Sequence, residues 1–269
     1  MQNNNYFFGE PDSSYNSVLD KMAHTEVHTC ETSSIPLADF WHPRNEGAIS
    51  QLIDLLGLGL DLDKMQKCFE YPVFAERKGN QIGRPSMTDL MLINNQYRIA
   101  IEGKYTEKLY DTIAKWKKNI KKNSNKPDVL ASWYDYIKNY ASFDENNISK
   151  IEHEVVYQFL HRTASACHKC DESGQKPILI YQLFYNEKEE KSKRRQEDVA
   201  SSLKTFAEEY LRFNEKIQFF IVLTPLINVD EVKKNNKKTD SGIFLKMKES
   251  PIYKFGNSLL FEKKSTQEF

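Results

Sequence analysis

Two apolar runs joined by a short polar turn constrain the fold of this chain more than any other feature of its sequence. The runs cover residues 88–93 and 98–104, and Asn-Asn-Gln at 94–96 lies between them. Apolar runs of this length, separated by so few polar residues, are typical of a β-hairpin. We therefore expect two adjacent antiparallel strands here, preceded by a third strand at residues 69–77.

Apolar patterns over the rest of the chain alternate between helical spacing and continuous strand-like runs. Helices are expected at residues 44–57, 107–120, 133–140, 152–167 and 196–213, buried strands at 177–185 and 216–223, and a weak strand at 242–247. The charged stretches at 187–195 and 233–238 are typical of solvated loops. This order predicts a single α/β domain at residues 41–269, with a mixed, partly antiparallel central sheet flanked by helices. Residues 1–40 are expected to form an irregular arm with a short helix near 15–22.

The overall composition is that of a folded protein without a global basic field. The 269 residues include 38 Lys and Arg and 38 Asp and Glu, so the formal net charge is zero and any nucleic-acid binding must come from a local patch. No apolar run approaches the roughly 18 residues that span a bilayer, and the first residues do not follow a signal-peptide pattern. We therefore expect a cytoplasmic protein that does not insert into a membrane.

The four cysteines are too few and too scattered for the disulfide framework of a small secreted domain. Cys167 and Cys170 form one Cys-x-x-Cys pair with His161 and His168 nearby. A structural zinc site usually needs a second pair at suitable spacing, and the sequence offers none. Reduced thiols are expected, and zinc is not.

Residues able to support catalysis gather on the predicted hairpin. Side chains alternate between the two faces of a strand, so Glu102 and Lys104 share one face while Gly103 points to the other. If the two strands pair through their turn, Asp89 falls close to Glu102. Two converging carboxylates favour a bound cation such as Mg²⁺, and an adjacent lysine can position the attacking water and stabilise negative charge that develops on phosphorus. This combination predicts a site for phosphodiester hydrolysis.

The hairpin segment GRPSMTDLMLINNQYRIAIEGKY resembles the active-site region of the PD-(D/E)XK superfamily of nucleases, which includes many restriction enzymes. The two motif acids correspond to Asp89 and Glu102, and the motif lysine corresponds to Lys104. Thr88 stands where the motif has its proline. The family core, a helix followed by three strands, a helix and a further strand, is similar to the order expected over about residues 45–185.

This resemblance implies a restriction-endonuclease-like core and a nuclease that hydrolyses DNA phosphodiester bonds with Mg²⁺, for which Mn²⁺ can substitute. The implied metal ligands are Asp89, Glu102, the backbone carbonyl of Gly103, and Glu46 on the preceding helix, while Lys104 completes the catalytic set. Restriction, other phage defence and repair are all compatible with it. The target sequence, endo or exo mode, DNA or RNA preference and oligomeric state, a homodimer included, stay open.

Each of these residues also has a purely structural interpretation. Glu102 and Lys104 could form a surface ion pair at a strand end, although their apolar neighbours argue for burial, where unpaired charge is costly. Asp89 could be a turn residue at the entry of its strand. Glu46 shares the apolar face of Ile49, yet it lies in the first turn, where an acid complements the helix dipole. Metal ligation and simple helix stabilisation are therefore both open for Glu46.

Candidate nucleic-acid contacts lie in two further segments. A lysine-rich stretch around Trp116 could follow a nucleic-acid backbone or form a solvated face. Its candidate contacts are Lys115, Lys117, Lys118, Lys121 and Lys122. On the helix expected at 152–167, His161 and Arg162, and similarly Gln158, could contact a phosphate or serve only in packing.

The nuclease interpretation has two competitors. A non-catalytic module that binds nucleic acid or protein could keep the same fold, although the complete set of acid, acid and lysine argues against it. An enzyme of unrelated chemistry would be favoured if folding placed Asp89 and Glu102 far apart. The distance between these two carboxylates therefore distinguishes the nuclease interpretation from unrelated chemistry.

Overall fold

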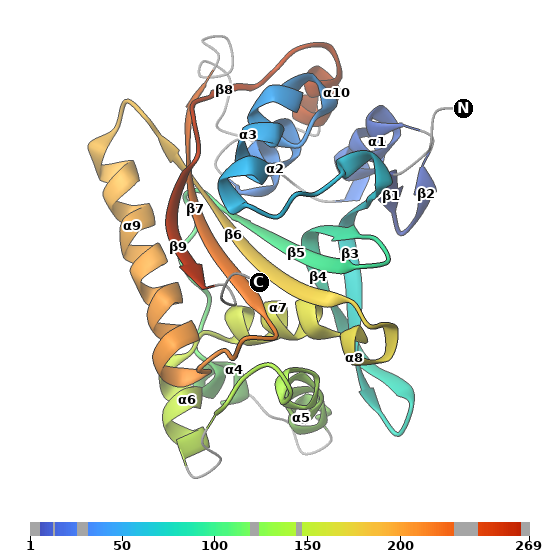
Figure 1. The fold of residues 1–269 in the computed structure, drawn as a ribbon, viewed down its shortest axis with the longest axis vertical. Helices are drawn as coiled ribbons and strands as arrows, with labels where there is room; N and C mark the ends of the chain where they lie inside the picture. Colours follow the sequence, from blue (N-terminus) through green and yellow to red (C-terminus); the bar gives the residue numbers. More distant parts are fainter. Residues whose placement is uncertain are drawn as a thin grey trace.

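The computed structural model of the chain describes residues 6–12, 14–25, 32–118, 124–143, 147–228 and 242–264. Within these residues the protein is built in three layers, with one mixed β-sheet between two layers of helices (Figure 1). This arrangement confirms the predicted α/β class with a partly antiparallel central sheet flanked by helices. None of the described helices combines the length and apolar character needed to cross a membrane.

The sheet contains both parallel and antiparallel strand pairs. The described strands are β1 (Tyr6–Phe8), β2 (Glu10–Asp12), β3 (Gln66–Arg77), β4 (Asn80–Ile93), β5 (Tyr97–Lys104), β6 (Lys176–Asn186), β7 (Gln218–Asn228), β8 (Tyr253–Phe255) and β9 (Leu259–Lys264). Their order is β2-β1-β3-β4-β5-β6-β7-β8, and β9 also pairs with β7. The β3/β4 and β4/β5 pairs are antiparallel, whereas β5/β6 and β6/β7 are parallel.

Helices cover both faces of this sheet. One layer is formed by α1 (Tyr15–Thr25), α2 (Ser34–Phe40), α3 (Glu46–Leu56) and α10 (Gly242–Glu249). The opposite layer is formed by α4 (Ile113–Lys117), α5 (Lys126–Ile137), α6 (Ile148–Glu154), α7 (Tyr157–Cys167), α8 (Cys170–Ser173) and α9 (Glu190–Thr205), which continues into a π-helical turn (Phe206–Tyr210). Each layer buries its own apolar core against the sheet.

Strand β5 contributes to both cores because it lies in the middle of the sheet. Ile99 and Ile101 pack in the core beneath α1, α2, α3 and α10, whereas Ala100 packs in the core beneath α5 and α7. This alternation was predicted from the strand period. It places Glu102 and Lys104 on the face that α7 covers.

The predicted hairpin is present as β4 and β5. Leu90 pairs with Ile101, and the Oδ1 atom of Asn94 accepts the backbone N–H groups of Gln96 and Tyr97, both at 2.8 Å. An asparagine side chain that accepts from the backbone two or three residues ahead is a common way to close a tight turn. The turn therefore fixes the register that brings the two strands together.

The N-terminal segment is not the irregular arm that we expected. Residues 6–12, 14–25 and 32–40 contain β1, β2, α1 and α2, and Val18 and Phe40 are fully buried in the core. The expected helix near 15–22 is present as α1. A mostly polar segment can still present a narrow apolar stripe to a core, and this segment completes the helical layer on one face of the sheet.

Two further stretches were also predicted wrongly. Residues 190–195, expected in a loop, begin α9, where the Nε atom of Arg194 donates to Glu190 at 3.1 Å one turn away. The weak strand expected at 242–247 is helix α10, which buries Phe244 and leaves Leu245 exposed. The other predicted loop, at 233–238, lies outside the described residues.

Two expected helices differ in length from their predictions. Of the helix expected at 107–120, residues 107–112 are not helical, α4 is present, and residues 119 and 120 lie outside the described residues. The helix expected at 152–167 is divided into α6 and α7. The division falls where the Val155 carbonyl accepts the N–H of Ile113 at 3.0 Å, in an antiparallel bridge between the two segments. This bridge draws the start of α7 toward the chain that leaves β5.

Candidate active site

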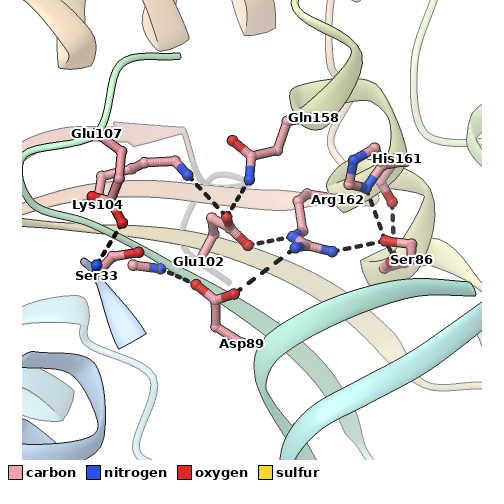
Figure 2. A network of polar contacts seen from close by, with 11 residues as sticks. Ser33, Ser86, Asp89, Glu102, Lys104, Glu107, Gln158, His161 and Arg162 are labelled. Atoms are coloured by element: carbon pink, nitrogen blue, oxygen red, sulfur yellow. Dashed lines mark hydrogen bonds and ion pairs between the residues drawn. The ribbon is translucent and has the colours of Figure 1, made fainter. Parts of the chain in front are cut away.

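Asp89 lies at the point where β4 and β5 separate. The described backbone pairing of the two strands ends with Leu90 and Ile101, and the N–H of Gly103 donates to Oδ2 of Asp89 at 2.9 Å. A side-chain carboxylate therefore serves as the acceptor where the ladder no longer supplies one. Figure 2 shows Asp89 beside Glu102, as the register of the hairpin predicts.

Glu102 is the most enclosed acid of the site, with an exposed fraction of 1%. Its Oε1 atom accepts from Nζ of Lys104 at 3.2 Å and from Nε2 of Gln158 at 2.6 Å. Its Oε2 atom accepts from Nε of Arg162. The interpretation of Glu102 and Lys104 as a surface ion pair is therefore wrong, because both side chains are buried.

Arg162 links the two carboxylates. It reaches them from α7, where Gln158 lies one turn earlier and points to the same face of the sheet (Figure 2). Besides its bond to Glu102, its Nη2 atom lies 3.8 Å from Oδ1 of Asp89, and its Nη1 atom donates to Oγ of Ser86 at 2.7 Å. The planar guanidinium thus contacts three groups on two strands.

The charges in this cluster nearly balance. Asp89 and Glu102 carry the acidic groups, and Lys104 and Arg162 carry the basic ones. Burial raises the pKa of Asp89, and the neighbouring Glu102 carboxylate raises it further, while the two cations and the Gly103 N–H oppose the shift. A raised pKa means that the Asp89 carboxyl holds its proton more readily than an ordinary aspartate does.

His161 also belongs to this cluster. Its Nδ1 atom shares a hydrogen bond with Oγ of Ser86 at 2.8 Å, and Ser86 in turn contacts Arg162. Burial, followed by the positive charge of Arg162, lowers the pKa of His161 well below its ordinary value. The imidazole is therefore neutral at physiological pH.

Two buried polar atoms beside Glu102 have no hydrogen-bond partner among the described residues. They are Oε1 of Gln158 and the hydroxyl of Tyr181, which lies on β6 in register with Glu102. Buried polar groups are paired in most proteins, so such atoms indicate a place that water or a ligand completes. On the side of the cluster that faces α7 and β6, these two atoms can therefore form hydrogen bonds to a water or a ligand.

The donor set fits a divalent cation that prefers oxygen. Among the described residues no group of three or more His, Cys, Asp and Glu side chains converges on one point. Mg²⁺ does not need such a group, because it binds through one or two carboxylates, several waters and substrate phosphate. Asp89 and Glu102 supply the two carboxylates, and the raised pKa of Asp89 indicates that a cation would stabilise its charged form.

Glu46 does not join this site, contrary to our expectation. It is exposed at the start of α3, whose buried residues pack on the opposite face of the sheet from Glu102. There it lines a separate cavity of about 380 Å³ together with Trp41 and Lys67. The helix whose start lies beside Gly103, near the end of β5, is α2. The interpretation of Glu46 as a residue that complements the helix dipole agrees with its position.

The lysine-rich stretch is only partly described. Lys115 is exposed and lies 3.8 Å from Asp111, and Lys118 is exposed as well. Lys117 instead donates to both carboxylate oxygens of Glu152, at 2.7 and 2.8 Å. Lys121 and Lys122 lie outside the described residues. Lys117 is thus engaged within the protein, while Lys115 and Lys118 remain on the surface.

Two other residues that support the site could not be predicted from the sequence. Ser86 joins Arg162 and His161, and Glu107 accepts the backbone N–H groups of Ser33 and Tyr105 at 2.5 and 3.0 Å. Glu107 therefore ties the start of α2 to the end of β5. Serine and glutamate at such positions carry no recognisable pattern, because their partners are distant in the chain.

Fold and site together define an α/β protein with a buried cluster of two acids, one lysine and one arginine on its central sheet. Residues 11–241 match the family model described as "Domain of unknown function (DUF6946)", and the chain belongs to this family. No curated protein and no solved structure matches the chain. The chemistry of the cluster therefore carries the functional argument.

Proposed function

We propose that this protein is a metal-dependent nuclease that hydrolyses phosphodiester bonds of DNA in the cytoplasm, with a core of the restriction-endonuclease type. The observation that carries the proposal is the convergence of Asp89, Glu102 and Lys104 on one face of the sheet, at the point where β4 and β5 separate. Two acids and a lysine in this arrangement can support phosphodiester hydrolysis with a bound metal ion.

Each residue of the set has a separate role in the proposal. Asp89, Glu102 and the backbone carbonyl of Gly103 would hold Mg²⁺ or Mn²⁺. When bound, such an ion supplies Lewis-acid stabilisation of phosphate charge and lowers the pKa of a coordinated water. Lys104 is held beside Glu102 by its 3.2 Å contact, where its ammonium can orient the nucleophilic water and stabilise charge that develops on the phosphate.

Arg162 would adjust the site rather than prevent metal binding. Its guanidinium pairs with both Glu102 and Asp89 in the protein alone, and a divalent ion would take over part of that role. A guanidinium released from one carboxylate has donors that match the oxygens of a phosphate. Arg162 can therefore release Asp89 or Glu102 and bind the substrate phosphate when metal and substrate enter the site.

The pairing of Arg162 with Glu102 and Asp89 also favours a second candidate function. If Arg162 keeps both carboxylates permanently paired, the cluster is a structural ion-pair network, and the protein is a non-catalytic module that binds nucleic acid or another protein. The two functions differ in one measurable respect. A nuclease requires a divalent metal for turnover, whereas a binding module does not turn over.

The proposed function is tested by a cleavage assay on single-stranded DNA, double-stranded DNA and RNA, each with Mg²⁺ or Mn²⁺. The proposal predicts cleavage of at least one DNA substrate in either metal and none after addition of a chelator. Cleavage that survives the chelator would contradict the metal mechanism. No cleavage of any substrate, with nucleic-acid binding retained, would favour the non-catalytic module.

A further inference from the structure

A cavity of about 370 Å³ opens beside the acid cluster, on the side of α7. Its lining residues are Tyr110, Asp111, Trp116, Tyr157, Gln158, His161 and Arg162. Three of these residues also belong to the cluster around Glu102, so the cavity and the proposed active site share a wall. Its volume falls within the range of roughly 300–1,000 Å³ that is typical of small-molecule pockets.

Aromatic rings form one wall of this cavity. Trp116 and Tyr157 are stacked, with ring centroids 3.9 Å apart and ring planes inclined by 10°. The hydroxyl of Tyr157 accepts the indole N–H of Trp133 at 2.9 Å, which fixes the ring from behind. The stacking and this hydrogen bond therefore hold the aromatic wall in place, and Nζ of Lys126 lies over the Trp116 ring, 4.7 Å from its centroid.

Tyr110 stands at the edge of the same cavity with 63% of its surface exposed. Its ring centroid lies 5.2 Å from Nζ of Lys104, so it is next to the proposed catalytic lysine. Large aromatic side chains that remain this exposed beside a polar site are common stacking platforms for the bases of single strands.

The polar groups of the cavity carry little net charge, because Asp111, the one acid in its lining, lies 3.8 Å from Nζ of Lys115. Gln158 donates through Nε2 to Glu102, so Oε1 is left as an acceptor, and this atom is buried without a partner. His161 is neutral because burial lowers its pKa. The charge of Arg162 is compensated by Glu102 and Asp89. Such a lining matches a neutral planar heterocycle better than an anion.

We propose that this cavity receives one unstacked nucleobase of the substrate strand, next to the phosphate at the acid cluster. The inference rests on the proposed nuclease function and names its substrate class, which is single-stranded or locally opened DNA. Every base presents an N–H donor on its pairing edge, so the Gln158 acceptor serves all four bases and the site selects an unpaired base rather than a sequence.

The test compares binding of two short, fluorescently labelled DNA single strands in the presence of a chelator, which prevents cleavage. One strand carries its bases, and the other has abasic sites throughout. Because stacking of bases on aromatic rings stabilises binding, the wild type should bind the normal strand roughly 5- to 150-fold more tightly than the abasic strand. Tyr110→Ala should lose most of this preference, and Tyr110→Phe, which keeps the ring, should retain it.

Equal affinity of the wild type for the two strands, or no measurable binding of either, would overturn the inference. An unchanged preference in Tyr110→Ala would overturn it too. Thermal unfolding checks that the variants are folded, which the exposure of Tyr110 leads us to expect. If the protein cleaves DNA but binds both strands equally, the proposed base cavity is rejected and the proposed nuclease function is kept. Base-dependent binding by a protein that cleaves nothing would support the cavity and reject the nuclease.

Discussion

Arg162 and Glu102 form an ion pair between side chains that are only 7% and 2% exposed and lie 60 residues apart in the chain. The pair holds α7 against β5. The Arg162 guanidinium also contacts Asp89, at the point where β4 and β5 separate. Buried pairs of this kind are costly to break, because the remaining partner keeps its charge without compensation. The Arg162 guanidinium thus supplies positive charge beside Asp89 and Glu102, where the proposed function needs a divalent metal ion.

Replacing Arg162 should make the fold depend on a metal ion. Arg162→Met removes the guanidinium, keeps much of its length and should destabilise the protein by roughly 3–5 kcal/mol. Added Mg²⁺ should raise the midpoint of thermal unfolding of this variant more than that of the wild type, because the ion replaces the lost charge. Arg162→Lys, which keeps a cation, is the matched control and should respond less. Equal responses of wild type and Arg162→Met to Mg²⁺ would show that Arg162 and the metal do not share a site.

The sequence was sufficient to predict the hairpin and the acids on it. A period of two along β5 and a short turn at 94–96 are local properties, and they determine that Asp89 and Glu102 meet. The buried strands β6 and β7 were predicted for a similar reason, because continuous apolar runs are typical of strands covered on both faces. These parts of the fold depend on patterns that lie within a few residues.

The rest depended on contacts between distant segments. Glu46 had the spacing of a buried acid, but the packing of α3 on the far face of the sheet leaves it exposed. Residues 242–247 were expected to form a weak strand, but they form helix α10, which packs against α1. Arg162 was one of several polar candidates on its helix. Its role became clear only when α7 was placed over β5.

Metal binding should depend on the protonation of Asp89. The pKa of Asp89 is raised by burial and by Glu102, so the carboxylate gains its proton at a higher pH than an ordinary aspartate. A protonated carboxyl is a poor ligand, and Mn²⁺ affinity should therefore fall as the pH is lowered, beginning above the usual range for an aspartate. Calorimetric titration with Mn²⁺ at several pH values measures this effect. Asp89→Asn should bind Mn²⁺ weakly at every pH, and equal uptake by variant and wild type would contradict the assignment.

A second buried acid, Asp39 on α2, should affect stability rather than function. Its Oδ2 atom accepts the N–H groups of Ile252 and Tyr253 at 2.8 and 2.7 Å. Burial nevertheless raises its pKa from 3.8 to about 6. The folded state therefore binds the proton more tightly than the unfolded state, so this group makes the protein more stable as the pH falls from about 6 to about 4.

Asp39→Asn should remove that contribution, because the amide oxygen can still accept both N–H groups but does not titrate. Between about pH 7 and pH 4, the stability of the wild type relative to the variant should increase by as much as about 3 kcal/mol. Urea unfolding of both proteins across this range provides the measurement. Parallel pH profiles would show that the Asp39 carboxyl has an ordinary pKa in the folded protein.

Salt dependence should separate the two kinds of lysine in the stretch around Trp116. Lys115 and Lys118 are exposed, whereas Lys117 is paired with Glu152. If nucleic acid binds along this surface, Lys115→Gln and Lys118→Gln should each reduce the slope of log affinity against log salt by roughly 0.7–0.9. Lys117→Gln should leave the slope unchanged. A slope that none of the three variants alters would place the binding surface elsewhere.

We propose that Glu102 belongs to a metal-dependent catalytic site, and the cleavage rates of two matched variants in Mg²⁺ measure its part in the reaction. Glu102→Gln removes a charged oxygen ligand and should lower the rate by more than about 100-fold. Glu46→Gln makes the same chemical change on the opposite face of the sheet and should leave the rate unaltered. Asp89→Asn serves as a second variant of the site if Glu102→Gln does not fold. Of these three variants, only Glu102→Gln and Asp89→Asn should lose cleavage. Full cleavage by a folded Glu102→Gln protein would exclude Glu102 from the catalytic site.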